Sequence, residues 1–131
     1  MAYAAVVTKT ERVVAGRRTW RIAIAETEAA VASEWSASLD YIGPVTLTRF
    51  ILTRSAGTAA TVQPKLGTAT GLAGLAFIAQ QAAAVAVATG VNDPSKRSFN
   101  LTDGKLYGRS TPDAGADNTF ATVLELTEGV V

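Results

Sequence analysis

The chain contains neither cysteine nor histidine. Without cysteine it can form no disulfide, iron–sulfur cluster or thiol nucleophile, which fits synthesis in a reducing compartment. Without histidine it lacks the commonest general base and transition-metal ligand, so Ser-His-Asp chemistry and most zinc sites are excluded. The glycine motifs that cradle phosphate groups are absent from the sequence as well. These absences together argue against an enzyme.

The sequence also has little net charge and few aromatic residues. Twelve Lys and Arg against eleven Asp and Glu leave a net charge of +1, too weak a field to attract a polyanion, so we expect no nucleic-acid partner. Aromatic residues make up 7% of the chain, and much of the 48% hydrophobic content is alanine and valine. Small side chains bury little area each. We therefore predict a homo-oligomer, either a dimer or a trimer.

No segment has the length and hydrophobicity of a membrane span. The most apolar stretch, residues 71–90, is mostly alanine and is interrupted by Gln80 and Gln81. The N-terminus lacks the basic start, long apolar centre and cleavage site of a signal peptide, so we expect synthesis in the cytoplasm and no membrane association. A length of 131 residues is typical of one domain, and we predict a single domain over residues 1–131.

Alternating hydrophobic residues predict strands in the first half of the chain. Trp20, Ile22 and Ile24 share one face of the first clear example, and Trp35, Ala37 and Leu39 share one face of the next. Residues 11–28 read as a hairpin around a turn at Gly16 and Arg17.

The segment from Val45 to Arg54 is apolar on both faces, so either a bulge lies near Arg49 or the strand is covered on both sides. The next residues predict a hairpin at a sheet edge, with Gly57 in a positive-φ turn and Pro64 ending the second strand.

The second half is less regular. Residues 72–88 favour strand or irregular structure, with a short helix as the alternative. Asp103 and Gly104 form a hairpin signal, and the last strand carries Phe120, Leu124 and Leu126 on one face. Many short strands separated by turns are typical of a sandwich, a jelly roll or a small barrel. We predict an all-β, single-domain β-sandwich of the jelly-roll type, with an N-terminal segment that can extend from it.

Three groups of residues suggest binding chemistry. Acidic residues around Glu26, at Asp93 and at 113–118 suit calcium, but the EF-hand spacing is absent, so we predict no metal site and no cofactor. Trp20 and Trp35 could form a sugar-stacking platform, but their alternation favours burial in the core. Arginines beside the first turn are typical of a solvated turn, with an acidic partner surface as the alternative.

Three stretches carry a resemblance to a known class of protein. They are "IAIAETEAAVASEW", "YIGPVTLTRFILTRSAGTAATVQPKLGTATG" and "GKLYGRSTPDAGADNTFATVLEL". In their order they resemble small structural proteins of tailed-bacteriophage virions, in particular the β-sandwich or jelly-roll cement proteins that decorate capsids. The resemblance covers most of the chain from Trp20 onward, and it carries no catalytic residues with it.

The resemblance implies a non-enzymatic protein of the virion that binds and stabilises a phage capsid, with the major capsid protein or other virion proteins as partners. Alternatives are a phage tail or neck component, a carbohydrate- or receptor-binding β-sandwich module, and a small hydrolase that uses carboxylates only. Because turns and termini project from a sandwich, we expect partner contacts at the N-terminal segment, the first turn and the loop before the last strand. The candidate residues are Tyr3, Val6, Val7, Arg17, Arg18, Pro112, Asp113, Asp117 and Asn118.

Overall fold

A computed structural model describes residues 3–29, 34–57, 61–68, 81–82, 87–88, 98–112 and 118–129. All regular elements that these residues form are strands, so the predicted all-β class is confirmed. In chain order the strands are β1 (Ala4–Val14), β2 (Arg17–Ala29), β3 (Trp35–Ser38), β4 (Gly43–Ala56), β5 (Thr61–Gly67), β6 (Gln81–Ala82), β7 (Val87–Ala88), β8 (Ser98–Leu101), β9 (Lys105–Pro112) and β10 (Asn118–Glu128).

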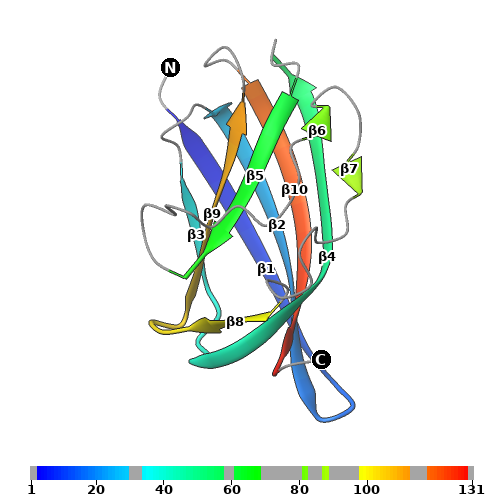
Figure 1. Cartoon of the computed structure of the whole chain (residues 1–131), viewed down its shortest axis with the longest axis vertical. Coiled ribbons are helices and arrows are strands. Elements are labelled where there is room, and N and C mark those ends of the chain that lie inside the picture. Colours follow the sequence, from blue (N-terminus) through cyan, green and yellow to red (C-terminus); the bar gives the residue numbers. More distant parts are fainter. Residues whose placement is uncertain are drawn as a thin grey trace.

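The strands form two antiparallel sheets that pack face to face as a β-sandwich (Figure 1). The six-stranded sheet has the order β1-β2-β10-β4-β7, with β8 also paired to β4, and the four-stranded sheet has the order β3-β9-β5-β6. Successive strands from β2 to β5 alternate between the sheets, and this order favours a jelly roll. The jelly-roll form stays a prediction, because β6 and β7 have only two residues each.

Alternation along the strands fills the space between the sheets. The core includes Trp20, Ile22 and Ile24 of β2 and Leu124 and Leu126 of β10, and each of these five is at most 2% exposed. The four-stranded sheet contributes a second set from β3, β5 and β9, which includes Trp35, Ala37, Val62, Leu66 and Leu106. On β2 from Arg21 to Thr27 and on β3, the side chains that alternate with the core residues are exposed, as expected for a sheet with one buried face. On β10 Ala121 is exposed and the other outward side chains are half-buried.

The predicted first hairpin is present, with its turn one residue earlier than expected. Val14 pairs with Arg17, so Ala15 and Gly16 form the two-residue loop. Their φ angles of 53° and 79° are those of a type I′ turn, which matches the twist of the flanking strands. The N-terminal segment does not extend as an arm from Ala4 onward, because β1 pairs with β2 along its whole length.

The irregular apolar pattern of β4 results from a bulge. Arg49 lies opposite Glu125 of β10, but Leu47 lies opposite Leu126, so Thr48 is the extra residue. Beyond the extra residue, inward and outward side chains exchange positions along the strand. Leu47 and Phe50, three residues apart, can therefore both face the core. The first of the two alternatives drawn from the sequence is therefore the one observed.

Two other predicted hairpins are wrong. β4 and β5 lie in different sheets, and so do β8 and β9. Turn residues occupy both connections, since Gly57 has φ 109° and Gly104 has φ 77°. The chain turns where the sequence indicates, but it crosses to the opposite sheet, because both successive strands have apolar faces that must meet across the core.

Pro64 does not end β5, contrary to the sequence interpretation. It lies in the middle of the strand, opposite Ser110 of β9. β6 covers the other edge of β5 only at Thr61 and Val62, so at Pro64 no β6 residue requires a backbone donor. Of the ambiguous segment 72–88, residues 81–82 and 87–88 are strand, and the rest lies outside the described residues.

Candidate functional site

A buried carboxyl group joins the two sheets. Glu26 follows Ile24 on the inner face of β2 and is completely buried. Its Oε1 accepts a hydrogen bond from the Ser110 hydroxyl at 2.7 Å, and its Oε2 accepts one from the Tyr3 hydroxyl at 2.9 Å. The cluster thus links β2 to the residue before β1 and to β9 of the opposite sheet. Both carboxyl oxygens are satisfied, as a buried polar group requires.

Burial sets the electrostatics of this cluster. Removal from water raises the pKa of Glu26, and the hydrogen bonds from Ser110 and Tyr3 offset only part of that rise. Burial and the nearby Glu26 carboxylate likewise raise the pKa of Tyr3, so its phenol remains a hydrogen-bond donor. Glu34 belongs to the same neighbourhood and accepts a hydrogen bond from Arg109 at 3.5 Å. Each group has a structural partner, and Glu26 lines neither of the two pockets described below.

We expect Glu26→Gln to be more stable than the wild type at neutral pH. Because the pKa of Glu26 is raised in the folded state, the folded protein binds this proton more tightly than the unfolded chain, whose pKa is near 4.5. The proton therefore adds to the stability below about pH 4.5, and this contribution is lost as the pH rises through the pKa of the folded state. The glutamine amide keeps the shape, accepts from Tyr3 and donates to Ser110, but it does not titrate. The difference in unfolding free energy should therefore grow as the pH is raised from about 4 to about 8.

Urea unfolding at several pH values measures this effect. Glu125→Gln is the control, because that carboxylate is partly exposed in an ion pair with Arg49 and should change stability by less than about 1 kcal/mol. A Glu26→Gln variant whose stability falls relative to the wild type as the pH rises would show that the carboxylate is needed in its charged form.

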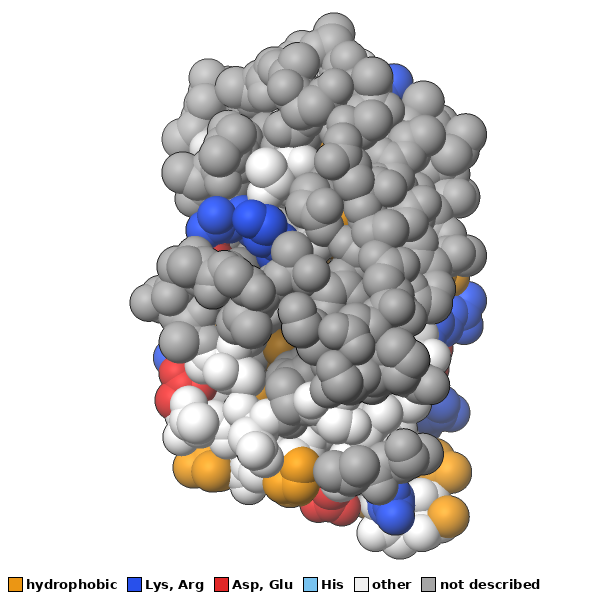
Figure 2. Space-filling view, viewed as in Figure 1, with side chains coloured by type: hydrophobic (Ala, Val, Ile, Leu, Met, Phe, Trp, Pro, Cys, Tyr) orange, Lys and Arg blue, Asp and Glu red, His pale blue; other side chains and the backbone are white. Residues whose placement is uncertain are grey.

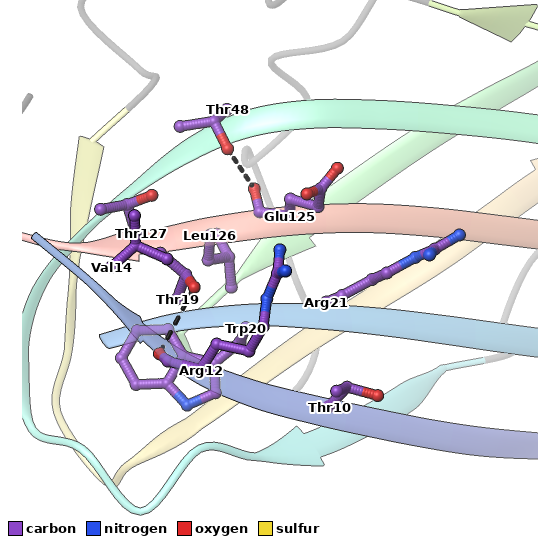
Figure 3. A pocket seen from close by; sticks show the side chains of 10 residues that line it. All are labelled: Thr10, Arg12, Val14, Thr19, Trp20, Arg21, Thr48, Glu125, Leu126 and Thr127. Atoms are coloured by element: carbon purple, nitrogen blue, oxygen red, sulfur yellow. Dashed lines mark hydrogen bonds between the residues drawn. The ribbon is translucent and has the colours of Figure 1, made fainter. Parts of the chain in front are cut away.

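A shallow groove lies on the outer face of the six-stranded sheet (Figure 3). Its volume is about 330 Å³, and Arg12 of β1 and Arg21 of β2 extend beside it on the same side of the sheet. Thr48 of the β4 bulge donates to the Glu125 carbonyl oxygen at 3.2 Å on its far side. The remaining lining residues are Thr10, Val14, Thr19, Trp20, Leu126 and Thr127. The lining side chains offer threonine hydroxyl groups and charges of both signs, from Arg12, Arg21 and Glu125.

Beyond this groove, the outer face consists of small and apolar side chains. The register aligns Val6, Ala25, Ala121 and Thr53 in one row across β1, β2, β10 and β4. The adjacent row consists of Thr8, Ala23, Val123 and Ile51. Val6, Ala25 and Ala121 are exposed. Among the described residues, these two rows carry no charged side chain, and a contiguous surface of this kind marks a contact area.

The lower end of the sandwich in Figure 1, where the β1–β2 hairpin turns, carries a second exposed group. Ile42 is 71% exposed beside a hollow of about 430 Å³ that is also lined by Asp40, Tyr41 and Asp103. Figure 2 shows hydrophobic side chains along this end, with acidic and basic side chains among them. Asp103 accepts bonds from the Tyr107 hydroxyl and the Lys105 amide, which hold its pKa below the usual value.

The predicted contact residues do not form one surface. Tyr3, Val6 and Val7 lie at the start of β1, whereas Arg17 and Arg18 lie at the opposite end of the β1–β2 hairpin (Figure 1). Pro112 ends β9, and Asp113 and Asp117 lie outside the described residues. Asn118 is completely buried against Gly57, so its side chain does not reach the surface.

Arg18 has a structural role that the sequence did not indicate. Its guanidinium pairs with Glu11 at 2.8 Å and lies 5.0 Å from the ring centre of Trp20. It also donates to the backbone oxygens of Leu39 and Asp40. These contacts close the lower end of the core, so Arg18 is engaged within the domain. Arg18 lies two residues before Trp20, so the alternation of the strand puts both on the inner face of β2, and this spacing could have indicated its role.

Both tryptophans are buried, as predicted. Trp20 is 1% exposed and Trp35 is 4% exposed, so neither offers a platform for stacking a sugar ring. Among the described residues, no group of three or more acidic side chains could hold a metal ion. No helix long and apolar enough to cross a membrane occurs in that part of the chain.

No family model, no curated protein and no solved structure matches this chain.

Proposed function

We propose that this protein is a non-enzymatic structural component of a tailed-phage particle, which binds the capsid shell and stabilises it. The observation that carries the proposal is the outer face of the six-stranded sheet, with its rows of small side chains around Ala25 and Ala121. A surface whose described residues carry no charge can lie against a shell subunit without desolvating ions. The charged side chains Arg21, Arg49 and Glu125 lie in the next row and form its polar border.

The arrangement of polar groups supports the same proposal. The most buried carboxyl group, Glu26, is held by Ser110 and Tyr3, and Arg18 is held by Glu11 and Trp20. These groups stabilise the sandwich from within, which fits a protein that acts through contacts on its surface. Many copies on a symmetric shell would multiply a modest contact into strong attachment. A position on the tail or neck is the alternative location for the same kind of contact.

Heating particles with and without the protein tests this proposal. Genome release, followed with a nucleic-acid dye, should occur several degrees lower in particles that lack the protein, and adding purified wild-type chain should restore the higher temperature. Ala121→Arg places a charge at the centre of the outer face and should weaken attachment at least about tenfold.

Ser36→Arg is the matched control, because Ser36 is also exposed but belongs to β3 of the other sheet. It should restore the release temperature as the wild type does. Equal release temperatures with and without the protein, and no copies on the shell, would contradict the capsid assignment and leave the tail or neck location.

A further inference from the structure

β1 is a long edge strand with one open side. It forms one edge of the six-stranded sheet and pairs with β2 without interruption from Ala4 to Val14. Within the described part of the chain, no backbone hydrogen bond is made along its other side. The strand contains no proline or bulge, two features that commonly protect an edge from pairing with another chain, and Lys9 is the one lysine along it.

The sequence of this strand is self-complementary. Residues 6–14 read VVTKTERVV, with two valines at each end and opposite charges on either side of Thr10. We propose that two copies of this chain pair through β1 in antiparallel orientation, about a two-fold axis at Thr10. Val6 then faces the partner's Val14, and Lys9 faces the partner's Glu11.

The backbone geometry fits this register. Val14 and Arg17 close the two-residue hairpin loop as a hydrogen-bonded pair, so every second residue back from Val14 directs its backbone groups toward β2. The residues between them direct their backbone N–H and C=O groups to the open side of β1. They are Val13, Glu11, Lys9 and Val7. Pairing about Thr10 puts these residues opposite one another, so each pair exchanges both of its backbone bonds.

The exposed hydrophobic side chains fit it as well. The large hydrophobic side chains most exposed in the described structure are Val6 at 67%, Val13 at 69%, Val14 at 51% and Ile42. The first three belong to β1, and each would face a valine of the partner. Cross-strand pairs of β-branched residues stabilise a sheet, and pairing here would remove exposed apolar area.

The charges select the register. Lys9 and Glu11 share the inner side of β1, where the Lys9 ammonium donates to the Ser38 carbonyl at 2.7 Å. The Glu11 carboxylate binds Arg18 and the Trp20 indole and remains partly exposed. Each group keeps further bonding capacity for its opposite in the partner. A shift of the axis to Lys9 or to Glu11 would place like charges face to face, which disfavours both neighbouring registers.

Such a dimer joins two six-stranded sheets edge to edge, and their outer faces point to the same side. The surface around Ala25 and Ala121 would be doubled, which suits attachment to a shell. Only this last step rests on the proposed function. The pairing itself is tested on purified protein without any particle, so its failure and that of shell binding are distinguishable.

Cross-linking locates the two-fold axis, because the chain has no cysteine of its own. Thr10→Cys should form an intermolecular disulfide under mild oxidation, since residues on the axis have Cα atoms about 4.5 Å apart in a pair that is not hydrogen-bonded. Thr8→Cys is the matched control on the same face, and its two copies would be separated by roughly 14 Å along the strands. Covalent dimer in the first variant and little in the second is the expected result; equal yields, or none in either, would overturn the proposal.

Sedimentation of the purified chain tests the role of the charges. The wild type should be a dimer at about 10 μM, and Lys9→Glu should raise the dissociation constant at least about tenfold, because two like-charge pairs replace two opposite ones. Lys9→Gln is the control, since its amide can still donate to Ser38, and it should have a smaller effect. A monomeric wild type, or a dimer equally strong in all three proteins, would contradict pairing through β1.

Discussion

Replacing Trp20 by alanine is expected to lower the free energy of unfolding by about 3–5 kcal/mol. The side chain is 1% exposed on the inner face of β2, near the start of the strand. Its indole Nε1 donates to Glu11 at 2.8 Å, and the ring lies 5.4 Å from that of Tyr41. Alanine would leave a cavity beneath the Arg18 guanidinium and remove a hydrogen bond from the edge strand. The loss of unfolding free energy should therefore have two sources: the cavity in the core, and the broken contacts of Trp20 with Arg18 and Glu11 at the lower end of the sandwich.

Urea unfolding followed by far-ultraviolet circular dichroism measures the effect without relying on tryptophan emission. Trp20→Phe is the matched control, because it keeps an aromatic ring and loses the donor to Glu11, and it should cost about 1–2 kcal/mol. If the alanine variant lost less than about 1 kcal/mol, the burial of Trp20 would not matter to the fold as described here.

The inner faces of the strands could be predicted from the sequence. The alternation around Trp20 and Trp35 predicted the burial of both residues, because a period of two reports directly which face of a strand is apolar. The same pattern contained the disturbance in β4, where a bulge at Thr48 reverses the parity. These features are local, so a single sequence is enough to predict them.

Strand pairing could not be predicted in the same way. The signal at Asp103 and Gly104 correctly marks a change of direction, and Gly104 has a positive φ. However, β8 pairs with β4 and β9 pairs with β3 and β5. A turn sequence fixes the local reversal of the chain, whereas burial across the whole core decides whether the next strand stays in the same sheet or crosses to the other.

The buried polar groups were missed for a related reason. In the sequence, Glu26 groups with acidic residues of the kind that bind calcium, although it follows Trp20, Ile22 and Ile24 at every second position and so belongs to the inner face. Its partner Ser110 is far away in the sequence, on β9 of the opposite sheet. Parity could have indicated burial, but only the packing of the two sheets brings the hydroxyl group to the carboxyl group.

The close packing of Trp35 on Gly108 leads to the second large effect. The two residues lie directly opposite each other in the β3–β9 pair, and the indole ring covers the glycine. A Cβ atom added at Gly108 would overlap with the ring atoms of Trp35. The ring is 4% exposed and has core residues around it, so it cannot move aside without disturbing them. We expect Gly108→Ala to cost about 3 kcal/mol, because overpacking of a core costs that much when the neighbour is rigid.

A double-mutant cycle distinguishes this overlap from a general effect on β9. Trp35→Leu removes the large ring, and alanine at position 108 should then fit, at a cost below about 1 kcal/mol relative to glycine. Ordinarily alanine is the better residue in a strand, since glycine loses more backbone entropy on folding. The coupling between the two sites should thus be about 2 kcal/mol or more. If Gly108→Ala destabilised the protein equally with tryptophan and with leucine at position 35, the cost would lie in the β9 backbone and not in the contact with the ring.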